Sequence, residues 1–179
     1  MSPPRQARRP PPPLDAPALE RLALRYVERF ATTRGKLTDY LRRKVRERGW
    51  EGPEPDPAAV AERMAALGYL DDRAWAEARA ASLGRRGLGA RRVAGVLRAA
   101  GVEDADRDAV APDVAARAVD AALRFARRKR LGPWGAGGLD RPAREKALAA
   151  MLRAGHPLDL SRRILALPAG EEPDAEALA

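Results

Sequence analysis

The side chains that most often carry out catalysis are scarce in this sequence. The chain has one histidine, His156, and no cysteine. His156 lies between a helix-ending glycine and Pro157, so we predict that it caps a helix or is partly buried rather than acting as a general base. Asp71 and Asp72 are adjacent acids at a predicted helix start, where carboxylates usually cap the helix and complement its dipole. We therefore predict that the protein is not an enzyme and uses no cofactor or metal.

Arginine is the side chain whose pattern points to a function. The chain has 34 basic and 25 acidic side chains, a net charge of +9, and its first 49 residues hold 13 of the basic ones against 5 acids. Arginine clusters bind polyanions through phosphate contacts and counterion release. Two alternatives stay open: each run is a solvated helix face, or the arginine content reflects a GC-rich genome. The arginines predicted to contact a nucleic acid or filament are Arg42, Arg43, Arg46, Arg85, Arg86, Arg91, Arg92, Arg98, Arg127 and Arg128.

These arginines lie on predicted helices that resemble one another. Gly49, Gly101 and Gly155 each close an arginine-rich amphipathic run, at intervals of 52 and 54 residues. Apolar residues stand four and eight positions before each glycine, on one helical face, and glycine suits a left-handed C-cap. No strand alternation of useful length occurs. We predict an all-α fold, a tandem array of three three-helix modules forming an elongated, curved molecule.

The predicted modules span residues 18–70, 71–111 and 112–167. The first has an apolar stripe from Leu19 to Phe30 and a third helix that begins at Asp56-Pro57 and buries Leu67. Trp75 and Ala78 are predicted to face inward from the next helix.

Aromatic residues at helical spacing are predicted to be core rather than platforms for base stacking; they are Tyr69, Trp75 and Phe125. The third module opens with a predicted helix over 112–130, and Asp140 caps its middle helix.

The two ends of the chain differ in composition from the modules. Residues 1–17 are rich in proline and arginine and predict a disordered arm, and residues 168–179 predict an acidic flexible tail. The N-terminus lacks an apolar leader, and no stretch approaches the roughly 18 apolar residues of a membrane span. We predict a soluble, cytoplasmic monomer with no membrane partner.

Two stretches of the chain resemble a known family. Residues 24–44 and the segment LGYLDDRAWA at residues 67–76 closely resemble the RecX family of bacterial recombination regulators. The Gly-Tyr-Leu-Asp-Asp motif, followed by an aromatic residue and alanine, is the motif most diagnostic of this family. The resemblance spans residues 19–167 and is strongest over 20–101. Lys36 stands where the family commonly has glutamate, which breaks the expected capping box, and residues 1–17 are not part of the shared pattern.

The resemblance implies a fold and a function. Members are built from tandem three-helix modules, bind along the groove of the RecA–DNA filament, and usually suppress its ATPase, strand exchange and coprotease activities. Hence we predict a non-enzymatic RecA regulator of homologous recombination, DNA repair and the SOS response, with the RecA filament and single- or double-stranded DNA as partners. Two alternatives remain open: a generic helical DNA- or RNA-binding protein, and a protein-interaction adaptor.

Overall fold

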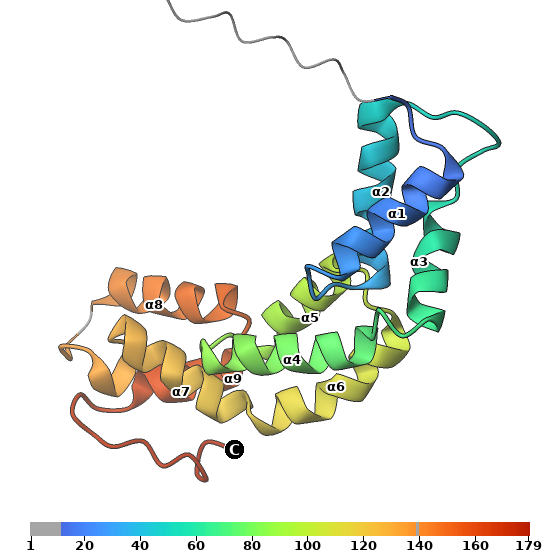
Figure 1. Ribbon diagram of the computed structural model, residues 1–179. Coiled ribbons are helices and arrows are strands. Elements are labelled where there is room, and N and C mark those ends of the chain that lie inside the picture. Colours follow the sequence, from blue (N-terminus) through green and yellow to red (C-terminus); the bar gives the residue numbers. More distant parts are fainter. Residues whose placement is uncertain (1–11, 139) are drawn as a thin grey trace, which may run out of the picture. The chain divides into compact units, whose positions relative to one another are not determined.

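The fold consists of helices joined by short loops. The computed structural model describes residues 12–138 and 140–179 (Figure 1). This part of the chain forms nine α-helices and one 3₁₀ turn, with no β-strand, so the predicted all-α fold is confirmed. The elements are α1 (Ala16–Val27), α2 (Arg34–Arg48), α3 (Pro57–Ala66), α4 (Asp72–Arg85), α5 (Ala90–Ala99), α6 (Asp104–Ala116), α7 (Ala118–Lys129), η1 (Gly132–Trp134), α8 (Arg141–Arg153) and α9 (Leu158–Ala166).

Polar side chains define where several helices begin. The Asp56 carboxylate accepts a hydrogen bond from Ala59 N at 2.9 Å, and the Asp140 carboxylate accepts one from Ala143 N at 2.8 Å. These contacts satisfy backbone N–H groups that have no intrahelical acceptor in the first turn. Both predicted N-caps are therefore confirmed. Thr33 caps α2 in the same way, accepting from Lys36 N at 3.1 Å, but Lys36 cannot return the second bond of a capping box.

The three repeated glycines end helices in a conformation that other residues rarely adopt. Gly49, Gly101 and Gly155 have φ angles of 81°, 71° and 94°, respectively. After Gly155, His156 N donates to Met151 O at 3.2 Å, and Gly155 N donates to Leu152 O at 3.0 Å. This pair of bonds is a Schellman motif, which satisfies the last carbonyls of a helix. Gly101 ends α5 with the same pair of bonds, so the predicted left-handed C-cap is confirmed at Gly101 and Gly155. At Gly49 it is wrong: the φ angle is positive, but the ψ angle of 174° lies outside the left-handed helical region.

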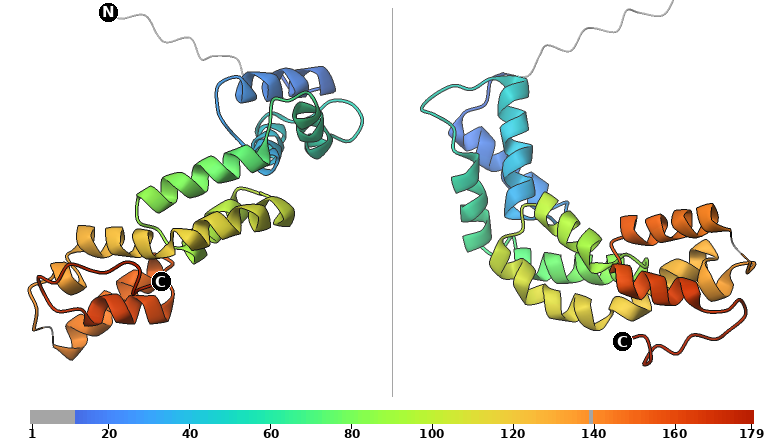
Figure 2. Two further views of the ribbon diagram at one scale, coloured as in Figure 1. Left: turned by 90° about the horizontal axis from the view of Figure 1, so that it is seen from below. Right: turned by 180° about the vertical axis from the view of Figure 1, so that it is seen from behind.

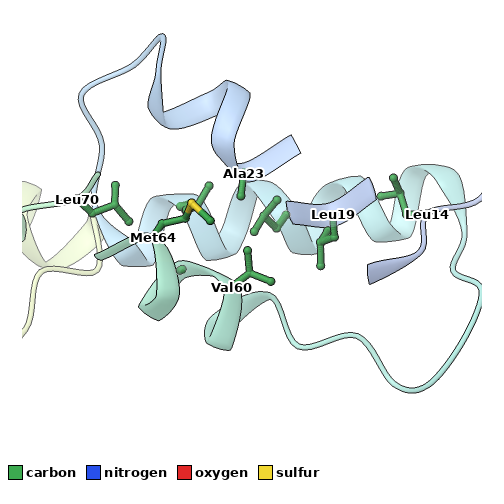
Figure 3. Close-up of a cluster of buried hydrophobic side chains, with 9 residues drawn as sticks. Leu14, Leu19, Ala23, Val60, Met64 and Leu70 are labelled. Atoms are coloured by element: carbon green, nitrogen blue, oxygen red, sulfur yellow. The ribbon is translucent and has the colours of Figure 1, made fainter. Parts of the chain in front are cut away.

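The described residues up to Asp71 form one compact unit, here called the first unit. Its core lies between α1, α2 and α3, with α2 packed extensively against α3 (Figure 3). Leu19 and Ala23 contribute from α1, Leu37 and Leu41 from α2. A further set of core side chains is Leu14, Val60, Ala61, Met64 and Leu70.

Four predictions for the first unit are corrected by this packing. Residues 1–11 of the predicted arm lie outside the described residues, but residues 12–17 are ordered, because Leu14 is fully buried and its N–H donates to Gly49 O at 3.0 Å. Phe30 lies beyond the end of α1 and is 53% exposed rather than buried. Leu67 and Tyr69 are also exposed, because the turn at Gly68 directs Leu70 into the core instead.

The residues from Asp72 onward form the second unit, which contains two hydrophobic clusters. In one cluster α4 lies beside α6 and both contact α5; in the other α7 lies beside α9 (Figure 2). Leu88, between α4 and α5, packs against both clusters and joins them. Each hydrophobic cluster of the chain thus comes from three consecutive helices, while the last two clusters share one unit. The curved array of three separate modules remains a prediction.

Two predicted helical features of the second unit are wrong. Pro112 does not begin a helix; it lies inside α6, and the next helix begins at Ala118. Val110 and Val114, four residues apart, both pack against the α4–α6 cluster, and their burial continues α6 past the proline despite its missing N–H. On α4 the buried face carries Ala76, Ala80 and Leu83 instead of Ala78, which is exposed.

The predicted flexible tail instead packs back onto the second unit. Leu178 is only 6% exposed and belongs to the cluster of α7, α8 and α9. Its carbonyl accepts from Arg163 Nη2 at 2.7 Å, and Gly170 N donates to Pro133 O at 2.8 Å. Burial of this one large apolar side chain anchors an otherwise acidic segment.

None of the helices in the described part of the chain has both the length and the apolar character that spanning a bilayer requires.

Candidate nucleic-acid interface

All ten predicted contact arginines are exposed, and they are divided between the two units. Arg42, Arg43 and Arg46 lie on α2 of the first unit. The other seven lie in the second unit, at the ends of α4 and α7, along α5, and in the turn between α4 and α5.

The α2 arginines are partly neutralised by carboxylates on their own helix. Arg42 lies 3.7 Å from Asp39, and Arg43 lies 3.6 Å from Glu47. Glu47 also accepts from Lys44 at 2.6 Å, and this hydrogen bond is the main reason that its pKa is lowered, with smaller contributions from Arg43 and Arg46. Exposed pairs of this kind contribute little to stability and are screened by salt. An incoming phosphate would therefore compete with these carboxylates for the arginines.

The arginines on α5 are held by fewer carboxylates than those on α2. This helix carries Arg91, Arg92 and Arg98, here called the α5 arginines, and no acidic side chain. None of the three forms an ion pair within the described part of the chain. Arg91 and Arg92 occupy the first turn, where the helix dipole disfavours positive charge. This placement costs stability within the protein and leaves the guanidinium groups available to an external anion.

A close contact with α8 fixes the position of the α5 arginines. Gly89 N donates to Ala154 O at 2.9 Å, and Arg91 N donates to Gly155 O at 3.3 Å. Two N–H groups at the start of α5 thus bond to the two carbonyls that directly follow α8, so these groups have partners that neither helix supplies within itself. A Cβ on Gly89 would overlap the carbonyl oxygen of Gly155, and a Cβ on Gly155 would overlap Arg92 N. The two backbones can approach this closely only because both positions are glycine.

A second contact brings together arginines that are distant in sequence. The Arg128 guanidinium donates to the carbonyl oxygen of Arg86, and its Cζ lies 5.5 Å from the centroid of the Phe125 ring. The end of α7 and the turn after α4 therefore form one basic group of Arg86, Arg127 and Arg128. Arg85, in contrast, lines a cavity of about 360 Å³ between α4, α5, α6 and α7.

The cavity that Arg85 lines has no net charge. Its lining includes two arginines that are not among the predicted contact residues, Arg117 and Arg124. Three carboxylates balance the three arginines: Glu77, Asp113 and Asp120. The cavity therefore offers an anion no net positive charge, in contrast to the α5 arginines. The described residues contain no group of three or more His, Cys, Asp or Glu side chains placed to hold a metal ion.

His156 is buried at the junction of α4, α5, α7 and α8, as the sequence partly predicts. The residue is 1% exposed, its Nε2 lies 3.2 Å from the carbonyl oxygen of Gly87, and its ring centroid lies 5.5 Å from that of Phe125. The carbonyl can only accept, so Nε2 carries the proton in the neutral ring. Nδ1 is buried and has no partner among the described residues. Burial lowers the pKa of His156, and the Gly87 contact opposes this only in part.

The lowered pKa of His156 predicts that the second unit becomes less stable below neutral pH. The unfolded chain takes up the proton near pH 6.5, whereas the folded chain takes it up only at a lower pH. The stability from neutral His156 is therefore fully present above about pH 6.5 and is lost as the pH falls, by at most about 1.4 kcal/mol per pH unit. Urea unfolding between pH 7 and pH 5 measures this slope. His156→Gln, which leaves the chain without histidine, should remove it; an unchanged slope would contradict the assignment.

The first unit also carries an aromatic and basic group that the sequence does not predict. The rings of Tyr26, Phe30 and Tyr40 lie in contact, beside Arg43 and Lys44. The four-residue spacing of Tyr26 and Phe30 was a usable signal for their contact. The contact with Tyr40 on α2 required the packing of two helices.

The fold and this surface define a small all-helical protein that exposes many arginines, several of them unpaired. No family model matches the chain. The chain is similar to the regulatory protein RecX of Myxococcus xanthus (strain DK1622), with 34% identity over 159 residues that cover 82% of this chain and 83% of the relative. The chain therefore belongs to the RecX family, as the Gly-Tyr-Leu-Asp-Asp motif predicts.

Proposed function

We propose that this protein is a non-enzymatic regulator of RecA that binds in the groove of the RecA–DNA filament and inhibits its recombinase, ATPase and coprotease activities. Membership of the RecX family is the observation that carries the proposal. The regulator would act in the cytoplasm, as a monomer built from three helical modules.

The exposed arginines support a filament groove as the binding site. The α5 arginines and the Arg86, Arg127 and Arg128 group can bind phosphate oxygens, which guanidinium groups contact in a bidentate manner. Several separate basic groups on one chain suit an extended polyanionic surface better than a compact ligand. In this proposal the protein occupies the groove and prevents filament growth without covalent chemistry.

The proposal is tested by ATP hydrolysis of RecA on single-stranded DNA, with this protein titrated from far below stoichiometric amounts. A regulator that acts on filament growth or integrity should inhibit at substoichiometric ratios. Inhibition that begins only when the protein coats all of the DNA would contradict the proposal. That result would favour a generic nucleic-acid-binding protein, which the unpaired α5 arginines also support.

A further inference from the structure

Three aromatic rings on the first unit form a connected group, here called the aromatic platform: Tyr26, Phe30 and Tyr40. The Tyr26 and Tyr40 rings are stacked, with centroids 4.2 Å apart and an interplanar angle of 21°. Phe30 extends the group, its centroid 5.1 Å from that of Tyr26 at an angle of 48°. The rings come from α1, the segment after it, and α2, so the fold of the first unit holds them in place.

The platform is anchored at one end and exposed at the other. Tyr26 and Tyr40 are half-buried and pack against the core of the first unit. Phe30 is 53% exposed, although it is wholly apolar. A single exposed apolar side chain is ordinary on a protein surface. An exposed phenylalanine that packs at an angle against one of two supported rings, however, offers an aromatic surface that a flat ligand can cover.

Cations lie beside the rings. Arg43 Cζ is 5.6 Å and Lys44 Nζ is 5.8 Å from the centroid of the Tyr40 ring. Lys36 lies one helical turn before Tyr40, on the same face of α2. Glu47 pairs with both Arg43 and Lys44, at 3.6 Å and 2.6 Å, so one carboxylate offsets part of this charge. The surroundings of the platform remain net positive.

We propose that the aromatic platform is a binding site for single-stranded nucleic acid, in which an unstacked base lies on the exposed ring and Arg43 and Lys44 contact the adjoining phosphates. Aromatic faces with flanking cations bind single strands with little sequence preference, because every base has a π face. A duplex keeps its bases stacked on each other and offers none to the platform. This site deepens the proposed function, since it would give the first unit its own contact with the DNA strand of a filament, but binding to the strand does not require RecA.

The proposal is tested with the full-length chain and a fluorescent oligodeoxythymidylate, in the absence of RecA. Phe30→Leu and Tyr40→Leu keep an apolar side chain and remove the ring. We expect each variant to bind the oligonucleotide roughly tenfold more weakly, within the range observed for loss of one stacked base. Affinity for a duplex of the same length should change less than twofold. Tyr69→Leu is the matched control, because Tyr69 is 49% exposed on the same unit, outside the platform, and its replacement should have no effect.

Crosslinking gives a second measurement that does not depend on the variants folding normally. An oligonucleotide containing 5-iodouracil should crosslink to Phe30 or Tyr40 on irradiation of the wild-type protein. Absence of crosslinks at both residues would overturn the proposal, as would equal losses on single strand and duplex, or unchanged single-strand affinity of Phe30→Leu.

Failure of the platform and failure of the proposed function can be told apart. If wild-type protein inhibits RecA while the ring variants bind the oligonucleotide normally, the platform is wrong and the regulator stands. If wild-type protein binds single strands through these rings without inhibiting RecA, the platform stands and the regulator is wrong.

Discussion

Replacing Gly89 by alanine is expected to destabilise the second unit by on the order of 3 kcal/mol or more. The added Cβ would overlap the backbone of Gly155 and His156, which cannot move aside as a flexible side chain can. Relief of the overlap would separate α5 from α8 and break the hydrogen bonds that Gly89 N and Arg91 N donate to α8, each worth about 1 kcal/mol. Denaturant unfolding followed by tryptophan fluorescence measures the loss, because Trp75 and Trp134 both lie in this unit.

Gly95→Ala provides the matched control for this prediction. Gly95 lies within α5, and a Cβ there would meet no atom within 4 Å. Alanine is the better helix former, so this variant should be more stable than wild type by up to about 1 kcal/mol. If Gly89→Ala lowers the stability and Gly95→Ala raises it, the loss comes from the contact between α5 and α8 rather than from replacing a glycine. A Gly89→Ala protein as stable as wild type would show that α5 and α8 do not approach as closely as described.

Features set by neighbouring residues could be predicted from the sequence. Asp56 and Asp140 each bond to a backbone N–H only three residues ahead, and Gly155 ends its helix through bonds to residues that immediately precede it. Such contacts depend on local chain geometry, so residue type and spacing are sufficient to find them. Most helix starts follow from them, and the all-α fold follows from the helical spacing of the apolar residues.

Features that depend on distant residues could not be predicted in this way. Proline at position 112 has a local preference for a helix start, and burial of Val110 and Val114 outweighs it. The close approach of Gly89 to Gly155 joins residues 66 positions apart, and nothing in either segment marks the other as its partner. The same holds for the candidate site. The exposure of the arginines could be predicted from their positions on the helices, whereas the contact of Arg128 with Arg86 depends on how distant helices pack.

Reversing the charge of Arg91 and Arg92 is expected to abolish most of the proposed function without unfolding the protein. The double variant Arg91→Glu, Arg92→Glu changes the net charge by −4 at two exposed positions that form no ion pair within the described part of the chain. We expect at least a tenfold increase in the protein needed for half-inhibition of RecA ATPase. Each lost phosphate contact should also reduce the slope of log affinity against log salt by about one.

The stability of this variant separates a binding defect from a folding defect. Glutamate in the first turn of α5 interacts favourably with the helix dipole, where arginine does not, so the variant should be as stable as wild type or slightly more stable. The matched control reverses Arg73 and Arg141, which carry the same charge but are already paired with Glu77 and Glu145 at 3.0 Å and 2.9 Å. Full inhibition by the Arg91 and Arg92 variant would remove the α5 arginines from the proposed interface. An equal loss in both variants would show that the filament responds to net charge alone, and that the position of α5 against α8 serves folding rather than recognition.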